Sequence, residues 1–600
     1  MDGIFLAGDL HMKTDHGDQK TFLGEHTSIS SVNEAVWSAK GVLFWLSLFS
    51  GVINLLMLTG PLFMLQVYDR VLPSGSFETL VVLFGIVVFL YLIFGLLDWV
   101  RSRILTRFGM RIANLLRPEI MEGVVRLDIK TGGALAATRP LQDLKVVQNY
   151  YSSPAFNLRF DAPWTLIFVG AIFLLHVWLG AYSVASIILL VAIAMFFHDS
   201  VTRRMERAEK ISREMARIAD ESRNTAEETV ALGMTGNLRR RWLEKHDRAQ
   251  QAAVRVRDGL ATLSANTRTL RLALQSGILA LGAWLAMNES ISSGGIVAAS
   301  IMLGRALQPI DQLIAHLRTY SRFKQARENL DAFLSQLPPP RGETPPVESP
   351  EGHMAVRNLA VFPPAVKTPV LEGVDFEVRP GQVVAIIGDS GVGKTSLLRT
   401  LAGVWPVQEN FGRVELDGVP LDHWPEELRG RITGYVSQQP VLFDDTVAAN
   451  IARLDPEPSV KALHRAVQRS GMEKMIHGLG GYDFRVGPGG ARLSGGQRYL
   501  IALVRALYGN PRILLLDEPL ASLDVPVQKQ LVHALRKLRK EGLAILVSTH
   551  NPMLVDVADK LLVLNFGPEQ RGRQVSFGTK AEILQRRQKL HTTRHFDERS

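Results

Sequence analysis

The chain has 600 residues, too many for one ordinary hydrophobic core, so at least two domains are expected. Hydrophobic residues make up 46% and charged residues 21%, which is too apolar for a soluble enzyme and too charged for a protein lying wholly in a membrane. The absence of cysteine excludes disulfides, thiol catalysis, cysteine-ligated zinc and iron–sulfur clusters. The formal charge of +10 makes nucleic acid a possible partner, and the positions of the basic residues decide that question.

Residues 1–36 are polar and mixed in charge. They have no basic segment running into an apolar stretch with a small-residue cleavage site, so they do not resemble a cleaved signal peptide. We expect a weakly ordered cytoplasmic arm here.

Long apolar stretches recur between residues 37 and 335. A membrane-spanning helix needs about 20 mostly apolar residues. The stretch 162–198 is too long for one span and is expected to divide at Trp178-Leu179-Gly180. The six expected spans are residues 41–66, 78–100, the two halves of 162–198, about 270–287 and about 294–317.

Basic residues are concentrated in two of the connections between these spans. The first–second connection carries one, Arg70, and the third–fourth and fifth–sixth connections carry none. The second–third and fourth–fifth connections carry Arg101, Arg103, Arg107, Arg111, Arg117, Arg126, Lys130, Arg139, Lys145 and Arg159, and Arg203, Arg204, Arg207, Lys210, Arg213, Arg217, Arg239, Arg240 and Arg241. Because cytoplasmic loops are the basic ones, both chain ends are predicted to be cytoplasmic. The same pattern accounts for much of the positive charge, so no nucleic acid is expected as a partner.

Both basic connections are long and have helical periodicity, as in residues 205–218, so the spans are expected to continue as helices beyond the bilayer. Six prolines in the 13 residues 338–350 indicate an extended linker. After it, short β-rich runs alternate with amphipathic helices, which is typical of an α/β domain. The predicted organisation is an arm at 1–36, a six-helix membrane domain at 37–335, a linker at 336–352, an α/β domain at 353–582 and a basic tail at 583–600.

A glycine-rich segment follows a buried strand predicted at residues 383–387. It matches the P-loop pattern G-x-x-x-x-G-K-[ST] and leads into a helix predicted at 396–402. Its glycines let backbone N–H groups turn toward phosphate oxygens, and the helix N-terminus adds its positive dipole end. Lys394 is expected to reach the β- and γ-phosphates of ATP, and Thr395 to place its hydroxyl on Mg²⁺. The predicted nucleotide-binding residues here are Gly388, Asp389, Ser390, Gly391, Val392, Gly393, Lys394, Thr395 and Ser396.

Further along, the apolar run 513–516 ends in Asp517 and Glu518. A buried strand that delivers carboxylates at its C-terminal end places them where an α/β sheet binds its ligand. Asp517 is expected to hold Mg²⁺, directly or through water, and Glu518 to act as the base for the attacking water. An apolar run ending in acids is common, so this pattern is informative only because it follows a P-loop.

Residues 493–497 read LSGGQ and end 20 residues before Asp517. With the P-loop and the acidic strand, in this order, the segment resembles the signature of ABC transporter cassettes, a branch of the P-loop NTPase fold. The resemblance implies that Gln438 senses Mg²⁺ and faces the membrane domain, and that His550 contacts the γ-phosphate. It also implies nucleotide contacts for Phe362, which would stack on adenine, for Asp524 of the D-loop, and for Ser494, Gly495, Gly496 and Gln497.

In this family the signature of one cassette closes over nucleotide held by the P-loop of another. One chain with one cassette therefore implies a homodimer with two composite sites. Two positions depart from the family pattern: Pro488 stands where exporters usually have Glu, and Tyr499 stands where Gln is common. Neither position touches phosphate chemistry, so both bear on coupling to transport and not on ATPase activity.

Six spans before one cassette resemble the exporters of the family. Residues 64–73, 160–164 and 304–309 resemble type I secretion permease/ATPases, the branch that exports proteases, lipases and RTX-like proteins. This implies a multi-pass protein of a bacterial inner membrane, with a periplasmic membrane fusion (adaptor) protein, an outer-membrane duct protein and a secreted polypeptide as partners. The 36-residue arm is too short for the peptidase domain of some relatives, which favours cargo with an uncleaved C-terminal signal. An exporter of lipid, drug or another small molecule with the same engine is the alternative; a non-transporting regulator is not expected.

Arg305 is predicted to lie near mid-membrane, because it follows Gly294 by about 17 Å at 1.5 Å per residue. A charge there normally faces protein or water. Two explanations are open: Arg305 lines the path of the polypeptide, or it forms a structural ion pair or reaches the interface.

Overall fold

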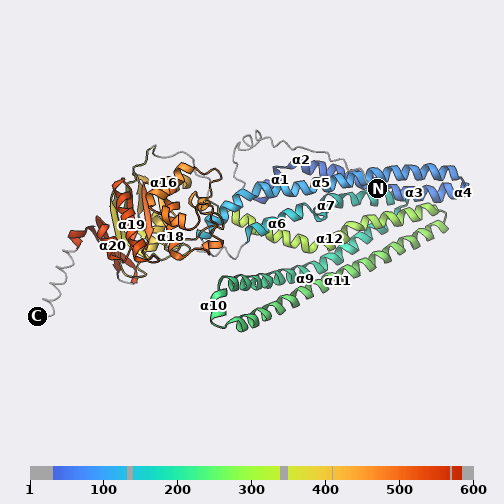
Figure 1. Cartoon of the computed structure of the whole chain (residues 1–600). Helices are drawn as coiled ribbons and strands as arrows, with labels where there is room; N and C mark the ends of the chain where they lie inside the picture. Colours follow the sequence, from blue (N-terminus) through green and yellow to red (C-terminus); the bar gives the residue numbers. More distant parts are fainter. Residues whose placement is uncertain are drawn as a thin grey trace, which may run out of the picture. The chain divides into compact units, whose positions relative to one another are not determined.

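The computed structural model describes residues 31–130, 139–337, 347, 349–408, 410–567 and 570–583. The chain forms two compact units that divide between Pro338 and Pro339, except that residues 128–130 group with the second unit. The first unit is helical and the second is built on a sheet (Figure 1). The predicted fold class, a helical membrane domain plus an α/β nucleotide-binding domain, is therefore confirmed.

The first unit contains long helices joined by short ones. Its elements are α1 (Val32–Trp37), α2 (Lys40–Leu56), α3 (Thr59–Gln66), the π-helix η2 (Val67–Val71), α4 (Leu72–Ser74), α5 (Phe77–Lys130), α6 (Pro140–Tyr151), α7 (Pro154–Asp161), the 3-10 turn η4 (Ala162–Trp164), α8 (Thr165–Leu175), α9 (Val177–Asn224), α10 (Ala226–Ala231), α11 (Thr235–Met287) and α12 (Ser293–Leu334). At 1.5 Å per residue the 54 residues of α5 span about 80 Å, whereas the hydrocarbon core of a bilayer is about 30 Å thick. Helices of this length continue well beyond any bilayer.

Five helical segments of the described chain are long and apolar enough to cross a membrane, so this is a multi-pass membrane protein. They are Lys40–Ser74, Phe77–Leu127, Pro154–Leu175, Val177–Arg223 and Thr235–Met287. The sixth expected span lies in α12, a continuous helix of 42 residues that is less apolar than the others.

The turn between the third and fourth expected spans lies at His176 and not at Trp178-Leu179-Gly180, so the predicted position was wrong. His176 is extended (φ −166°), and its Nδ1 accepts a hydrogen bond from the Trp178 backbone N–H at 3.2 Å, which caps α9. Gly180 lies within α9, where an added Cβ would come within 2.3 Å of the Phe173 ring. The glycine therefore allows α8 and α9 to pack closely across the turn and does not break the helix.

A buried polar network joins α2, α5 and α7. The Arg101 guanidinium, 8% exposed, donates to Asp161 Oδ1 at 2.9 Å and to Asp98 Oδ1 at 2.7 Å. Ser50 and Asn54 of α2 donate to the same Asp161 oxygen. Burying the Arg101 charge is tolerated because two carboxylates pair with it, although its Nε has no hydrogen-bond partner among the described residues. The predicted secretion-type stretch 160–164 therefore holds three helices together.

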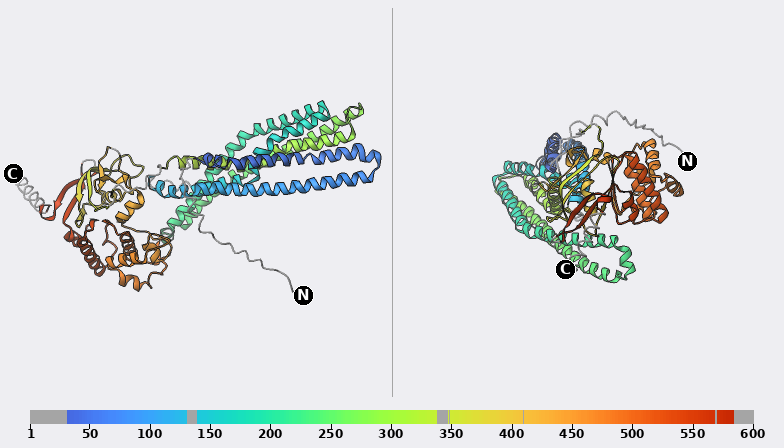
Figure 2. Two further views of the ribbon diagram at one scale, coloured as in Figure 1. Left: turned by 90° about the horizontal axis from the view of Figure 1, so that it is seen from above. Right: turned by 90° about the vertical axis from the view of Figure 1, so that its left-hand side faces the viewer.

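The second unit contains a sheet with helices beside it (Figure 2). The sheet has 10 strands in the order β5-β4-β1-β2-β10-β9-β3-β8-β7-β6. The strands are β1 (Met354–Val361), β2 (Leu371–Val378), β3 (Val383–Ile387), β4 (Arg413–Leu416), β5 (Val419–Pro420), β6 (Thr433–Val436), β7 (Ile513–Asp517), β8 (Ala544–Ser548), β9 (Lys560–Phe566) and β10 (Gly572–Thr579). The helices are α13 (Lys394–Leu401), α14 (Glu426–Ile432), α15 (Val447–Ile451), α16 (Val460–Ser470), α17 (Glu473–Gly478), α18 (Gly495–Tyr508), α19 (Val525–Lys540) and α20 (Pro552–Val557), with 3-10 turns η5 (Leu421–His423) and η6 (Pro488–Gly490).

Neighbouring residues of β3 enter different hydrophobic cores, because side chains of a strand alternate between the two faces of a sheet. Val383 and Ala385 pack with α18 and α19, whereas Val384 and Ile386 pack with α13 and the antiparallel strands. The strands β6, β7, β8, β3 and β9 are parallel to their neighbours in this series. Their carboxyl ends therefore share one edge of the sheet, where an α/β fold binds its ligand.

Candidate nucleotide site

The P-loop connects β3 to α13, as the sequence predicts. Gly391 (φ 83°) and Gly393 (φ 105°) have backbone angles that side chains with a Cβ rarely adopt. Gly393 is the N-cap of α13, so Lys394 and Thr395 form its first turn, two residues earlier than predicted. The arrangement leaves the helix N-terminus facing the loop, which suits an anion.

Asp517 and Glu518 end β7 beside β8. Asp517 is fully buried, and its Oδ1 accepts a hydrogen bond from the Ser548 hydroxyl at 2.6 Å. The Glu518 backbone N–H donates to the same hydroxyl at 3.0 Å, and Glu518 has φ 43°, which is uncommon for a residue with a side chain. Ser548 therefore orients both acids, a role that the sequence did not assign. A small hydroxyl residue at the end of the neighbouring strand is the signal that could have indicated it.

Lys394, His550 and Glu518 meet at this edge. Lys394 Nζ lies 2.9 Å from His550 Nε2 and donates to the Gly388 carbonyl at 2.8 Å and the Asp389 carbonyl at 3.0 Å. His550 Nε2 lies 3.3 Å from Glu518 Oε1. Burial lowers the pKa of Lys394, while the Glu518 and Asp517 carboxylates oppose this shift. Residues from the ends of β3, β7 and β8 thus form one cluster, although they lie up to 156 positions apart in the chain.

The second oxygen of Asp517 fits a cation. Asp517 Oδ2 is buried and has no hydrogen-bond partner in the described part of the chain. A buried carboxylate oxygen without a donor is costly unless a positive charge meets it. Carboxylate oxygens are the ligands that Mg²⁺ prefers.

No hydrogen bond, ion pair or ring contact of the described residues joins two other predicted residues, Gln438 and Phe362, to this cluster. Gln438 follows β6, the strand beside β7, and its side chain is exposed. Phe362 follows β1, is only 6% exposed and packs edge-on against Phe411, with ring centroids 4.8 Å apart. Phe411 is 47% exposed and offers more open aromatic surface than Phe362. Adenine stacking by Phe362 stays a prediction.

The signature begins α18 with a capping box. Ser494 Oγ accepts from the Gln497 N–H at 3.2 Å, and Gln497 Oε1 accepts from the Ser494 N–H at 2.9 Å. A Cβ on Gly496 would lie 3.0 Å from the Ser522 carbonyl oxygen, so the signature packs tightly on the loop that ends at Asp524, the N-cap of α19. Within the described chain, no hydrogen bond or ion pair joins signature residues to P-loop residues.

The two departures from the family pattern lie close to the signature. Pro488 begins the 3-10 turn η6, in which Gly489 has φ 61°. Tyr499 of α18 is 1% exposed, and burial raises its pKa well above the usual value. Tyr499 is therefore a core residue of this helix.

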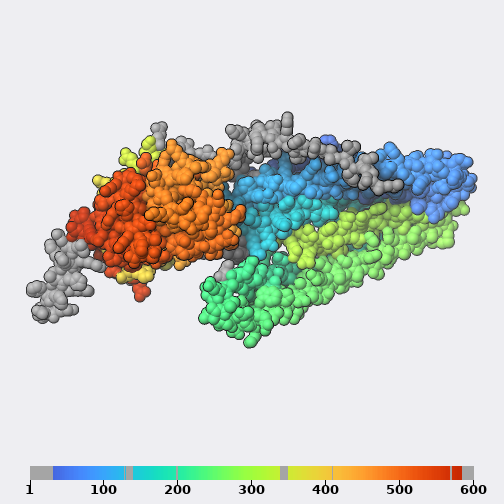
Figure 3. All heavy atoms as spheres, viewed as in Figure 1, coloured from blue at the N-terminus to red at the C-terminus, as the bar shows by residue number. Residues whose placement is uncertain are grey.

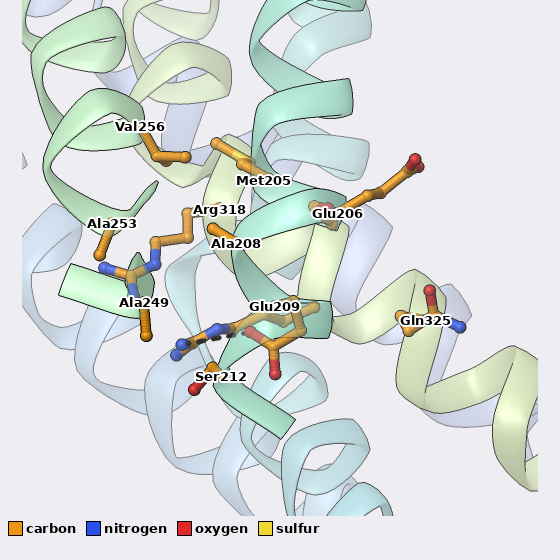
Figure 4. Close-up of a pocket in the computed structure, with 12 residues that line it drawn as sticks. Met205, Glu206, Ala208, Glu209, Ser212, Ala249, Ala253, Val256, Arg318 and Gln325 are labelled. Atoms are coloured by element: carbon orange, nitrogen blue, oxygen red, sulfur yellow. Dashed lines mark ion pairs between the residues drawn. The ribbon is translucent and has the colours of Figure 1, made fainter. Parts of the chain in front are cut away.

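A small cavity lies between α9, α11 and α12 in the first unit. Its volume is about 120 Å³, and its lining includes Glu209, Arg318 and Arg322, with Arg322 and Glu209 paired at 3.7 Å (Figure 4). Pockets for drug-sized ligands are about 300–1,000 Å³. This cavity is too small for such a ligand or for a polypeptide.

Comparison with known proteins agrees with both units. Residues 41–308 match the ABC transporter transmembrane region, and residues 371–521 match the ABC transporter family, a range that includes the P-loop, Gln438, the signature, Asp517 and Glu518. The chain is 33% identical to the "Type I secretion system ATP-binding protein PrsD" of Rhizobium meliloti (strain 1021), over 89% of this chain and 91% of that protein.

Two further relatives match about half of the chain. An "ATP-dependent lipid A-core flippase" of Chromobacterium violaceum is 34% identical over 51% of this chain and 53% of its own length. The "Multidrug resistance-like ATP-binding protein MdlA" of Escherichia coli (strain K12) is 31% identical over 48% of this chain and 49% of its own length.

Among solved structures, a bacterial Atm1-family ABC exporter with ATP bound has a TM-score of 0.77 and 22% identity, covering 91% of this chain and 96% of that one. This likeness concerns the fold alone. The strand-end cluster, the two family matches and the relative that spans nine-tenths of the chain lead to one conclusion: this chain belongs to the ABC transporter family and is an exporter that couples ATP hydrolysis to transport.

Proposed function

We propose that two copies of this chain form two composite ATP sites, and that ATP hydrolysis there drives a polypeptide across a bacterial inner membrane. The convergence of Lys394, His550, Glu518 and Asp517 at one sheet edge is the observation that carries the chemistry. Among the described residues no hydrogen bond or ion pair joins the signature to the P-loop of the same chain, which supports a partner cassette as the second half of each site.

In each site the P-loop backbone, from Gly388 to Ser396, binds the phosphates, and the Lys394 ammonium leaves its loop carbonyls for the β- and γ-oxygens. Glu518 accepts a proton from the attacking water, and His550 donates to the γ-phosphate. Asp517 Oδ2, Thr395 and Gln438 would hold Mg²⁺, which neutralises charge on the phosphates. The partner's signature serine and glycine N–H groups stabilise the same phosphate from the other side.

The relative that spans most of the chain supports a polypeptide as cargo, because it is a type I secretion protein. Two of the secretion-type stretches also hold the membrane unit together. Asp69 accepts from the Ser292 hydroxyl at 2.6 Å and the Gly294 N–H at 2.8 Å, so it caps α12, and Asp161 anchors the buried network described above. The proposed partners are a periplasmic adaptor, an outer-membrane duct and the secreted protein, with both termini of the exporter in the cytoplasm.

A lipid or drug exporter is the second candidate. A lipid A-core flippase and a multidrug resistance-like protein are similar to about half of this chain, so the shared ATPase cassette by itself does not determine the cargo.

Secretion profiling separates the two candidates. Culture media are compared between cells with the wild-type chain, cells with Glu518→Gln and cells without the gene. A polypeptide that is present only with the wild-type chain supports protein export. The second candidate would be favoured if the set of secreted proteins is unchanged and either an outer-leaflet lipid or the drug tolerance of the cells differs.

A further inference from the structure

One face of α12 carries a row of polar side chains through the segment that is expected to cross the membrane. Arg305, Gln308, Gln312 and His316 follow one another at spacings of three, four and four, which places them on one side of a helix. Arg305 is exposed and the other three are half-buried. Because of this polar row, α12 is less apolar than the five helical segments of the described chain that are long and apolar enough to cross a membrane.

The opposite side of α12 is fixed in the core. Ala299, Leu303, Leu307 and Ile314 are at most 3% exposed and pack against neighbouring helices. The helix therefore cannot rotate its polar row inward without exposing these side chains, at about 25 cal/mol for each Å² of apolar surface.

The helix α11 continues the polar surface beside this row. Both helices reach the surface side by side (Figure 3). Arg271 of α11 pairs with Asp311 of α12, and Gln275 lies against Gly304, where an added Cβ would come within 2.2 Å of its Nε2. Because Arg271 neutralises Asp311, that carboxylate does not compensate Arg305. Arg305 hydrogen-bonds only to Gln308, at 3.3 Å, among the described residues.

The surface of this row is therefore polar with a net positive charge. Lipid tails cannot cover it, since an uncompensated charge in the hydrocarbon core is expensive. A dry contact with a second copy whose two-fold axis passes through this row is unfavourable, because it would bring the same positive row against itself. A water-filled space that admits negatively charged groups meets both conditions.

We propose that the row of Arg305, Gln308, Gln312 and His316 contacts the exported chain in transit and favours unfolded polypeptide segments rich in Asp and Glu. The amide and imidazole groups hydrogen-bond to the extended backbone, and the Arg305 guanidinium attracts the carboxylates. This inference rests on the proposed function, and it assigns the class of polypeptide that the exporter prefers.

The test uses the full-length exporter in nanodiscs of neutral lipid, with poly-L-glutamate and poly-L-lysine of equal length as probes. The ratio of probe-stimulated to basal ATPase is measured for the wild type, Arg305→Lys, Arg305→Glu and the matched control Lys324→Ala, an exposed cation of the same helix. We expect poly-L-glutamate to stimulate the wild type, Arg305→Lys and Lys324→Ala, with about fivefold weaker stimulation in Arg305→Glu. Poly-L-lysine is expected to stimulate only Arg305→Glu.

Equal responses of the wild type and Arg305→Glu to poly-L-glutamate would overturn the inference, even if cells still secrete a protein through this exporter. Stimulation by an anionic lipid in the nanodisc that depends on Arg305, without any response to poly-L-glutamate, would overturn it in favour of a lipid headgroup. If the secreted proteins are the same with and without the wild-type chain, the proposed function itself fails. The two failures are therefore distinguishable.

Discussion

Charged side chains that are buried have different partners in the two units of this protein. In the second unit, Asp517 is fully buried, and one of its oxygens is left without a partner in the described chain, at an edge that also holds Lys394 and His550. In the first unit, Arg101 is buried with both of its acid partners in place, and Arg305 is exposed on the helix surface. In the second unit a buried carboxylate oxygen without a partner lies at the site of chemistry, whereas in the first unit a buried guanidinium paired with two carboxylates holds helices together.

Among substitutions that test this contrast, the largest effect on activity is expected at Glu518. Replacement by Gln keeps the shape but removes the base for the attacking water, so steady-state ATPase should fall by about 10²–10⁴-fold. Nucleotide binding, measured by fluorescence of a labelled ATP, should persist, because Lys394 and the P-loop are unchanged. An ATPase rate within twofold of the wild type would remove Glu518 from the mechanism.

The next effect concerns the paired charges of the membrane unit. Arg101→Ala leaves the half-buried Asp161 without its cation and should destabilise the first unit by about 3 kcal/mol. The thermal unfolding midpoint in detergent measures this effect. Arg103→Ala is the control, since Arg103 is exposed and lies over the Trp99 ring at 4.3 Å. Equal midpoints for the two variants would contradict the structural role of the network.

A smaller effect is expected for Ser548→Ala, which removes the hydroxyl that holds Asp517 and the Glu518 N–H. A hydrogen bond to a charged group contributes about 1.5–3 kcal/mol, so ATPase should fall and the Mg²⁺ concentration for half-maximal rate should rise. Ser470→Ala is the matched control, because Ser470 is equally buried but, among the described residues, donates only to the Val467 carbonyl. If both variants require the same Mg²⁺ concentration, Ser548 does not orient the acid.

The smallest effect is expected at the cap of α12. Asp69→Ala removes the hydrogen bonds to the N-cap residue Ser292 and to Gly294 of the first turn and should cost about 1 kcal/mol, whereas Asp69→Asn keeps an acceptor and should cost less. The thermal unfolding midpoints of the two variants show which substitution destabilises the protein more. Equal losses for Ala and Asn would show that the charge of Asp69 matters and the cap does not.

The sequence was sufficient for the fold class and for the positions of the P-loop and of the acidic strand end, because each of these is a contiguous segment. The nucleotide-binding roles of their residues stay predictions. The role of Ser548 and the burial of Phe362 could not be predicted, because each depends on a neighbour distant in the chain, Asp517 on the adjacent strand and Phe411. The turn at His176 was misplaced because Gly180 suggests a turn but instead allows close packing against Phe173. The polar row of α12 was detected only at Arg305, since glutamines and one histidine do not interrupt an apolar pattern strongly.

The composite ATP site is tested most directly by mixing two inactive variants. Lys394→Ala removes the P-loop cation, and Gly495→Asp places a carboxylate in the signature, where a Cβ would meet the Ser522 Cβ at an ordinary 3.7 Å and the fold is preserved. Each variant alone should lack ATPase activity, because every site contains one defect. Co-assembled chains should recover ATPase activity, because a mixed dimer contains one site with an intact P-loop from one chain and an intact signature from the other. Mixed dimers without any recovery, confirmed by two affinity tags, would contradict a site built from two copies.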